Sequence, residues 1–490
     1  MGVPSQPLFI PRNSFIAPVK FRFSNEASGY GEGLNHFRKN SIPTMNTYHP
    51  QRPTRRDFLK TGAKTAVATL GFPTIIKSSA LGADGATAPS NRITMGVAGW
   101  GMQAPGNTGQ FLNNPSVQVI AACNVDQKHM EAALGSINGK YGNKDCRAYK
   151  DYREMMAQKD IDSVMLAVPD NWHGLMSVEA ANNKKDIYGE KPLARTIREQ
   201  QAIVKAAQAN NIIWQTGSWQ RSTENFLKAA EMVRSGLIGK VTAVEVGLPA
   251  GHTDFAGTKD KMQASPPPPE LDYEMWIGPA QMEPYIAGRI HMNWRWNYNI
   301  GGGQMLDWIG HHCDIAHWGM DWDNSGPTDI TPVQVDMPPR TDVWNTATKY
   351  RAELTYPGGV KMTIAGGHGD IRGGTKWIGE NGWIWVDRGG FDGSNPDWKK
   401  FSRLPEADRK VPLYYSGDHF KNFIDCVKSR KPTITPVATA HHSALPGHLA
   451  LIAFLVNRPL KWDAAKEEII GDAEATKLMG REFRGPWKLA

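Results

Sequence analysis

The fold of this chain is decided by residues 93–104, which read Ile-Thr-Met-Gly-Val-Ala-Gly-Trp-Gly-Met-Gln-Ala. The apolar run at residues 93–98 predicts a buried strand, and Gly99, Gly101 and Ala104 follow it at the spacing G-x-G-x-x-A. In such a unit the first glycine permits a tight turn, the second lets backbone approach a pyrophosphate, and the third small residue lets helix pack on strand. The next helix presents free N–H groups to phosphate. The pattern predicts a dinucleotide-binding turn, although an ordinary strand–turn–helix fits this spacing equally well.

Predicted strands and helices alternate after this turn. Apolar runs at residues 117–123, 161–168, 186–188 and 212–215 predict buried strands, and helical stretches separate them. Strands that alternate with helices in this way form parallel sheets. We therefore predict an α/β fold with a doubly wound parallel sheet over residues 91–216.

Polar residues follow several of these strands, at the edge where open α/β sheets bind ligands. In this fold an acid about 20 residues past the glycines holds the ribose hydroxyls. Asn124 stands in that place and Asp126 lies just beyond it, so the choice between NAD and NADP stays open. Lys191 ends a further strand within Glu190-Lys191-Pro192, and the proline ring restricts Lys191 to extended geometry. An equally plausible interpretation is that Lys191 is an ordinary surface lysine after a strand.

Composition excludes some classes of protein. With 490 residues, 40% of them hydrophobic, the chain is expected to hold two domains or more. Its net charge of +8 does not indicate a nucleic-acid partner, because residues 1–83 contain eleven Lys and Arg against three Asp and Glu and so carry the whole excess. The four cysteines are widely spaced without a C-x-x-C pair, which suggests neither a zinc site nor a disulfide framework, and Cys123 is predicted to be a small buried residue.

The basic excess belongs to a predicted targeting segment. Residues 54–60, Thr-Arg-Arg-Asp-Phe-Leu-Lys, resemble a twin-arginine export signal, and a modest apolar run at residues 66–76 follows. That run is far below the roughly 20 apolar residues of a spanning helix, so we expect no stable membrane anchor. We predict a leader and linker over residues 1–90, with Met45 as the translation start, and a periplasmic or secreted protein. The alternative is a chance arginine pair in a tail.

The remaining residues, 217–490, are predicted to form an α+β domain for substrate binding and oligomerisation. Strands are predicted at residues 241–246, 350–354, 360–364, 375–378 and 382–386, and helices at 419–428 and 438–456. The proline-rich residues 257–271 predict an extended surface loop. A sheet of this kind packs one face on the core and leaves the other free for a partner subunit.

Two stretches carry side chains suited to carbohydrate. Gln220 and Arg221 offer donors to sugar hydroxyls, although a surface role for this arginine is equally plausible. Residues 291–299 interleave aromatic and hydrogen-bonding side chains, among them Trp294, Arg295 and Asn297. This mixture suits sugars, whose C–H faces lie on rings while their hydroxyls need polar partners. The alternative is that these tryptophans belong to the core.

A helix predicted after Gly301-Gly302-Gly303 carries a candidate acid–base pair. Asp307 and His311 share one helical face, with Asp314 further along. A carboxylate beside an imidazole raises its basicity and fixes its tautomer, as a proton-abstracting histidine needs. Other interpretations are a purely structural histidine, or a metal site of Asp307, His311, His312 and His317, which lacks a third ligand at fitting spacing.

In this order the motifs resemble the Gfo/Idh/MocA family (glucose-fructose oxidoreductase/inositol dehydrogenase). The likeness rests on the glycine turn, residues 168–173 (Val-Pro-Asp-Asn-Trp-His), Glu190-Lys191-Pro192 and the Gly-Gly-Gly…Asp307…His311…Asp314 series, and runs from about residue 92 to the C-terminus. The leader and residues 460–487 further resemble a secreted, twin-arginine-exported branch. Asn124 at the ribose position, and the bulky Trp100 and Met102 in the glycine turn, depart from the family pattern.

The resemblance implies an N-terminal Rossmann domain, a C-terminal domain with an open, mostly antiparallel sheet, and a homodimer or homotetramer acting on sugars or cyclitols. Catalytic roles then fall to three residues: His311 takes a hydroxyl proton, Asp307 orients His311, and Lys191 hydrogen-bonds the reacting oxygen. The predicted cofactor contacts are Gly99, Trp100, Gly101, Met102, Gln103, Asn124, Asp126, Val168, Pro169, His173, Glu190 and Lys191. The predicted substrate contacts are Gln220, Arg221, Trp294, Arg295, Asn297 and His311, and no metal is predicted.

Three functions are compatible with these residues. The first is an NAD(P)-dependent oxidoreductase for a sugar or polyol hydroxyl, with its NAD or NADP tightly bound because the export compartment offers no free nucleotide. The second is an exported glycoside-cleaving enzyme that oxidises the sugar transiently with NAD. The third is a catalytically idle sugar-binding or assembly protein, against which the intact set of Lys191, Asp307 and His311 argues.

Overall fold

The computed structural model describes residues 88–489, and the predicted export signal at residues 54–60 lies outside them. The first sheet has six strands in the order β3-β2-β1-β4-β5-β6, all paired in parallel. Its strands are β1 (Ile93–Ala98), β2 (Val117–Cys123), β3 (Arg147–Tyr149), β4 (Ser163–Leu166), β5 (Asp186–Gly189) and β6 (Trp214–Thr216). The predicted doubly wound parallel sheet is confirmed. Strand β3 was not predicted, because its three residues are partly exposed and show no apolar run.

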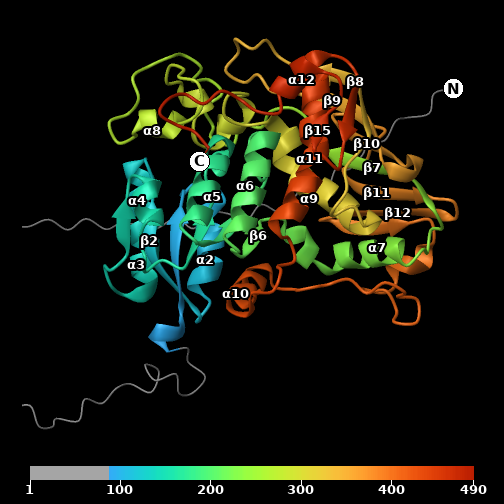
Figure 1. Ribbon diagram of the computed structural model, residues 1–490, viewed down its shortest axis with the longest axis horizontal. Helices are drawn as coiled ribbons and strands as arrows, with labels where there is room; N and C mark the ends of the chain where they lie inside the picture. The colour runs from blue at the N-terminus through green and yellow to red at the C-terminus, as the bar shows by residue number, and fades with distance from the viewer. Residues whose placement is uncertain (1–87, 490) are drawn as a thin grey trace, which may run out of the picture. The chain divides into compact units, whose positions relative to one another are not determined.

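Helices cover both faces of this sheet (Figure 1). They are α2 (Ala104–Leu112), α3 (Gln127–Tyr141), α4 (Tyr152–Met156), α5 (Asp170–Asn182) and α6 (Ile197–Ala209). On one face α2 and α3 bury Phe111 and Ile137, together with Phe423 from a helix near the C-terminus. On the other face α4, α5 and α6 bury Met155, Leu175 and Ile203. Each side of the sheet therefore has its own apolar core.

The strand order reverses between β1 and β4, which are neighbours with Ala98 opposite Leu166. The connections that leave these two carboxyl ends run to opposite sides of the sheet, and a crevice opens between them. The glycine turn that follows β1 lies at this point.

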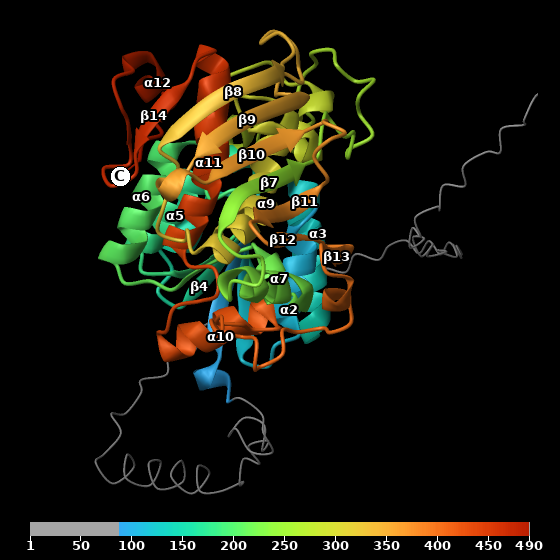
Figure 2. The ribbon, with the colours of Figure 1, turned by 90° about the vertical axis from the view of Figure 1, so that its right-hand side faces the viewer.

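The second sheet has nine strands in the order β13-β12-β11-β7-β10-β9-β8-β14-β15 (Figure 2). They are β7 (Val241–Leu248), β8 (Asp329–Asp336), β9 (Lys349–Thr355), β10 (Lys361–Gly366), β11 (Gly374–Gly379), β12 (Gly382–Asp387), β13 (Gly390–Gly393), β14 (Leu460–Asp463) and β15 (Glu468–Ile469). Every pair is antiparallel except β7 with β10. The expectation of an open, mostly antiparallel sheet is confirmed. Strand β8 was not predicted. Ile330 is its one buried residue, so apolar and polar residues do not alternate along it.

Helices pack on one face of the second sheet. The α-helices in residues 217–489 are α7 (Glu224–Arg234), α8 (Tyr273–Ile277), α9 (Gly303–Met320), α10 (His419–Ser429), α11 (Val437–Val456) and α12 (Ala473–Lys477). Helices α7, α9 and α11 share one core with the inward residues of the strands, such as Val244, Tyr350 and Trp377. The outward residues of β9 are at least partly exposed, and Figure 2 shows this face without a covering helix. Among the described residues no helix is both apolar and long enough for a membrane crossing.

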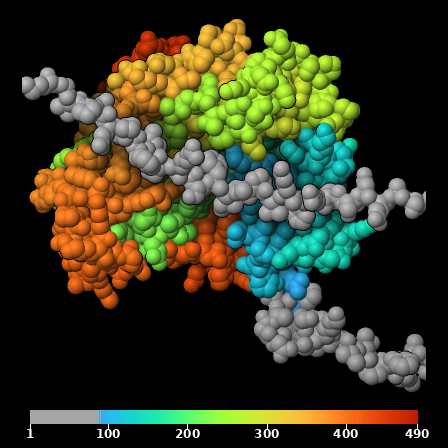
Figure 3. Space-filling view, turned by 180° about the vertical axis from the view of Figure 1, so that it is seen from behind, coloured from blue at the N-terminus to red at the C-terminus, as the bar shows by residue number. Residues whose placement is uncertain are grey.

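The segment between β7 and α9 reaches back to the first domain. Leu271 forms a β-bridge with Asp126, and Gln127 N–H donates to the carbonyl of Glu270. In Figure 3 this yellow-green segment lies beside the blue and cyan residues of the first domain. It contains two short 3₁₀ helices, η4 (Ala287–Arg289) and η5 (His291–Trp296), and η5 places aromatic residues next to the crevice.

Candidate active site

The glycine turn after β1 has a conformation that only glycine tolerates. Gly99 has a φ of +89°, and a Cβ there would lie 2.2 Å from the carbonyl oxygen of Ala167 on the neighbouring strand. A Cβ at Gly101 would meet no atom within 4 Å. Helix α2 begins directly afterwards without a side-chain cap and without an acidic residue in its first turn. Its first N–H groups therefore have no side-chain cap, and together with the positive dipole end of the helix they fit a pyrophosphate.

We predict that alanine destabilises the protein at Gly99 and has almost no effect on stability at Gly101. Gly99→Ala should lose about 1–2 kcal/mol from the left-handed backbone alone, and more from overlap with the Ala167 carbonyl. Gly101→Ala serves as the matched control and should unfold at nearly the wild-type denaturant concentration, because its methyl group enters open space. Urea unfolding of both variants makes the measurement. Equal midpoints for the two would contradict the assigned turn geometry.

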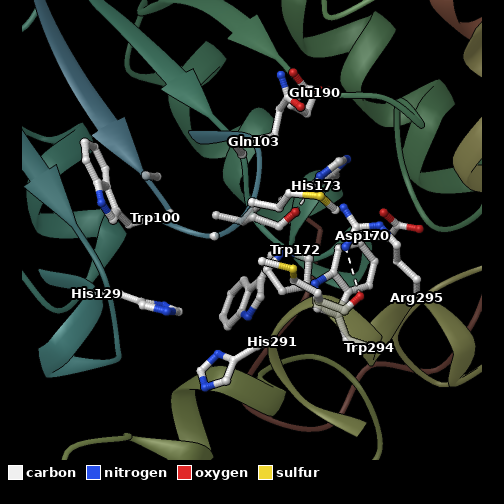
Figure 4. Close-up of a pocket in the computed structure, with 18 of the residues that line it drawn as sticks. Trp100, Gln103, His129, Asp170, Trp172, His173, Glu190, His291, Trp294 and Arg295 are labelled. Carbon is white, nitrogen blue, oxygen red and sulfur yellow. Dashed lines mark hydrogen bonds between the residues drawn. The ribbon is translucent and has the colours of Figure 1, made fainter. Parts of the chain in front are cut away.

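A cavity of about 460 Å³ extends from this turn to helix α9. It is lined by sixteen of the predicted site residues, which are Gly99, Trp100, Gly101, Met102, Gln103, Asn124, Asp126, Val168, Pro169, His173, Glu190, Lys191, Trp294, Arg295, Asp307 and His311. Figure 4 shows its two ends, with His129 and His291 at one and Asp170, Trp294 and Arg295 at the other. The dinucleotide-binding turn and the candidate acid–base residues thus share one cavity.

At one end of the cavity the carboxylate of Asp126 caps helix α3. Its Oδ1 accepts from the N–H groups of Lys128 and His129, and the Asn124 side-chain oxygen accepts from Asp126 N–H at 3.0 Å. Asp126 Oδ2 lies 3.7 Å from Nε2 of His291, whose ring packs edge-on against His129. Hydroxyl groups of a bound ribose would meet a carboxylate, an amide and two imidazoles here.

At the other end, Lys191 and Asp307 form an ion pair across the domain boundary. Lys191 Nζ lies 2.9 Å from Asp307 Oδ1 and 3.0 Å from the Asp307 carbonyl oxygen. Arg295 Nε also donates to Asp307 Oδ1, at 3.2 Å. Burial by itself raises the pKa of Asp307, but the charges and hydrogen bonds of Lys191 and Arg295 outweigh it and hold that pKa at about 2. Asp307 is therefore a carboxylate at neutral pH, and it holds the Lys191 ammonium group at the cavity wall.

His311 is buried one helical turn further along α9, without a hydrogen bond on its Nδ1. Its pKa lies well below 6.5, because burial disfavours the charged ring and the charges of Lys191 and Arg388 act in the same direction. The prediction that Asp307 orients His311 through a hydrogen bond is wrong. Asp307 Oδ1 accepts from Lys191 and Arg295 instead. The two residues share a helical face, but Trp308 rather than Asp307 packs against the His311 ring, with centroids 5.5 Å apart. The structure leaves His311 as a neutral imidazole, the form required of a base.

His173 and Glu190 join the strand ends that frame the cavity. The ring nitrogens of His173 lie 2.9 Å from the Val168 carbonyl oxygen and 2.7 Å from that of Pro192. Glu190 Oε1 accepts from the Asn107 amide of helix α2 at 2.8 Å. These contacts fix Lys191 relative to the glycine turn.

Three predicted substrate residues do not reach the cavity, and their assignment is wrong. The Arg221 guanidinium is buried and pairs with Asp314 at 2.8 Å and with Asp323 at 2.7 Å. The buried Gln220 accepts a hydrogen bond from Arg388 Nε at 3.3 Å. The Asn297 amide donates to the carbonyl of Val343 at 3.1 Å. The sequence around a residue does not show whether its side chain has a partner in the protein interior. These three buried polar residues were therefore mistaken for substrate contacts.

Metal-ligating side chains gather at two places among the described residues. They are Asp126 with His129 and His291, and His441 with His442 and Glu467. The alternative set of Asp307, His311, His312 and His317 is not brought together, since His317 bonds to the Tyr356 hydroxyl at 2.7 Å.

The cavity also contains residues outside the predicted set. These include His129, Asp170, Trp172, Trp219, His291, Trp308 and Arg388. Asp170 and Trp172 lie within the polar stretch after β4, and their position at the end of a strand could have predicted that they line the cavity. Arg388 lies in the turn between β12 and β13, and no motif in the neighbouring sequence predicts that it lines the cavity.

Comparison with known proteins assigns both halves of the chain. Residues 93–218 match the model of an oxidoreductase family, NAD-binding Rossmann fold, and residues 224–489 match its C-terminal alpha/beta domain. The NAD-binding protein from Listeria innocua has a similar fold, with a TM-score of 0.53 at 17% identity, covering 76% of this chain and 97% of that one.

Two curated relatives match the N-terminal part. A stretch of 150 residues is 29% identical to inositol 2-dehydrogenase of Salmonella paratyphi B, covering 30% of this chain and 43% of that protein. A stretch of 203 residues is 26% identical to a glycosyl hydrolase family 109 protein of Shewanella pealeana, covering 38% of this chain and 44% of that protein. The match spans less than half the length of these relatives.

Proposed function

Because the chain belongs to the Gfo/Idh/MocA oxidoreductase family, we propose that it is an NAD(P)-dependent oxidoreductase acting on a hydroxyl-bearing carbon of a sugar or polyol. The observation that carries this proposal is that Lys191 and His311 line the same cavity as the glycine turn. The inositol 2-dehydrogenase relative supports the substrate class. A bound nicotinamide dinucleotide supplies the hydride-accepting ring, and Gly99 to Gln103 with the start of α2 would hold its pyrophosphate.

Each of the two residues has one task in this proposal. The neutral His311 imidazole takes the proton of the substrate hydroxyl. Lys191 has three N–H donors, of which two go to Asp307, and the third is available for the substrate oxygen as negative charge develops there. Asp307 positions this ammonium group. Trp294 and Trp308 give the wall apolar faces for a sugar ring.

The test is nucleotide reduction by the purified protein. The nucleotide that co-purifies is identified by absorbance and mass, and the protein is then incubated with NAD or NADP and a panel of sugars and cyclitols. Appearance of reduced nicotinamide with one of them supports the proposal and decides the cofactor. Failure of every sugar to reduce either nucleotide, with nucleotide bound, would overturn it.

The buried state of His311 predicts the pH dependence of this activity. A base must be neutral to accept a proton, and an ordinary imidazole becomes half charged at pH 6.5. Since the pKa of His311 lies well below that value, kcat/KM for oxidation should not fall as pH drops from 7.5 to 6.5, and its acid limb should lie at lower pH. A pH profile of the wild type beside His311→Asn makes the measurement. An acid limb centred above pH 6.5 that vanishes in the variant would contradict this pKa.

A second candidate function is supported by the glycosyl hydrolase family 109 relative. The same groups would then oxidise a ring hydroxyl transiently while a glycosidic bond is cleaved. Glycoside cleavage with NAD neither consumed nor released would favour this candidate over net oxidation.

We also propose export and self-association. The twin-arginine pattern at residues 54–60 supports export to the periplasm or beyond, which suits a nucleotide loaded before export and held tightly. The uncovered face of the nine-stranded sheet supports a homodimer or homotetramer. Fractionation of cells with an Arg55→Lys/Arg56→Lys variant and light scattering of the purified protein test the two proposals.

A further inference from the structure

Arg388 lines the cavity and has no ion-pair partner among the described residues. It lies in the exposed turn after β12, between two indole rings, with its Cζ 4.7 Å from the Trp219 centroid and 4.6 Å from that of Trp308. Its Nε donates to Gln220 Oε1 at 3.3 Å, and Gln220 is itself fully buried. Among the described residues, no carboxylate makes an ion pair with its guanidinium. The neighbouring Asp387 faces His312 instead, at 3.5 Å.

Arg295 and Lys191 differ from Arg388 because both are bound to Asp307. Of the three cations near the acid–base residues, Lys191, Arg295 and Arg388, only Arg388 has no ion-pair partner among the described residues. The hydrogen bond to Gln220 uses Nε and leaves the two terminal nitrogens of Arg388 for a ligand, and a planar guanidinium can bind an oxyanion with two parallel hydrogen bonds.

This wall of the cavity is continuous with the acid–base residues. Trp308 contacts both Arg388 and the His311 ring, with 5.5 Å between the centroids of Trp308 and His311. A sugar ring lying against Trp308 would therefore have one edge at His311 and an anionic substituent within reach of Arg388.

We propose that Arg388 is a specificity-determining residue that selects a sugar bearing an anionic oxygen group, either a carboxylate or a sulfate ester. The inference rests on the proposed function for its assignment of the cavity as a sugar site. Neutral sugars offer the Arg388 guanidinium no ion-pair partner. An anionic sugar gains charge-assisted hydrogen bonds there, which are stronger than those of a neutral hydroxyl.

The test measures binding rather than turnover, so that it is independent of hydride transfer. D-Glucose, D-glucuronate and D-glucose 6-sulfate, together with the corresponding galactose series, are titrated into the full-length protein, with and without NAD. Calorimetry or quenching of tryptophan fluorescence reports the affinity. We expect at least one anionic sugar to bind about ten- to a hundredfold more tightly than its neutral counterpart, the range of a charge-assisted hydrogen bond. The tighter of the carboxylate and sulfate arms identifies the group.

Variants of two arginines complete the test. Arg388→Gln should abolish the preference for the anionic sugar, and Arg388→Lys should restore part of it. Arg372→Gln is the matched control, because Arg372 also lies over a tryptophan, Trp385, but outside the cavity, and it should keep the preference. Equal affinity for charged and neutral sugars in the wild type, no binding of any anionic sugar, or a preference that survives in Arg388→Gln would overturn the proposal. Binding that follows Arg388 without nucleotide reduction by any sugar would refute the oxidoreductase function alone.

Discussion

Lys191→Met is expected to lower kcat for sugar oxidation by about a hundred- to a thousandfold, the usual cost of removing one donor to developing negative charge. Methionine keeps an unbranched side chain, one heavy atom shorter than that of lysine, but cannot donate to the substrate oxygen. It also leaves Asp307 with Arg295 alone, so the carboxylate is free to turn into the space that the ammonium occupied. Steady-state kinetics with the best substrate of the panel gives the measurement.

Two controls separate this loss from a loss of structure. Lys205→Met changes an exposed lysine on α6 outside the cavity and should retain wild-type turnover. Nucleotide affinity of the Lys191→Met protein should be little changed, because the glycine turn and the start of α2 are intact. Wild-type kcat in this variant would remove Lys191 from the mechanism, and loss of nucleotide binding would assign it to the cofactor site instead.

Arg221→Met is expected to reduce the free energy of unfolding by about 3–5 kcal/mol, since it leaves a buried carboxylate without its cation. The side chains of Arg221 and Asp314 are 3% and 1% exposed, so water cannot replace the lost partner. Asp323, at 28% exposure, can turn outward and costs less. The double variant Arg221→Met/Asp314→Leu should recover much of the loss, because a buried pair replaced by apolar side chains is often close to neutral.

Denaturant unfolding of the single and double variants measures this cost. Steady-state kinetics of the folded Arg221→Met protein provides a second test of the structural role of Arg221. A structural residue alters the unfolding midpoint and leaves the KM of the folded enzyme near that of the wild type. A substrate-binding residue would raise KM at unchanged stability, and that outcome would contradict the ion-pair assignment.

Local signals in the sequence were reliable where short-range geometry decides the outcome. The strand from residue 93, the turn at Gly99 and the helix from Ala104 depend on backbone conformation and apolar spacing within a dozen residues. The predicted helices at residues 419–428 and 438–456 agree with α10 and α11 to within one residue at each end, because α10 is amphipathic and α11 is a long, largely apolar segment. Strands β8 and β15 have few buried residues, so no apolar pattern in the sequence predicts them.

The sequence by itself determined the alternation of strand and helix, the glycine turn, and the shared helical face of Asp307 and His311, since each follows from neighbours along the chain. Only the tertiary structure decided what those side chains touch. Lys191, 116 positions earlier in the chain, takes Asp307 as its partner, Arg221 takes Asp314, and Arg388 has no ion-pair partner among the described residues. The physical reason is that an ion pair is made by proximity in space and by burial, and both depend on how two distant sheets pack around one crevice.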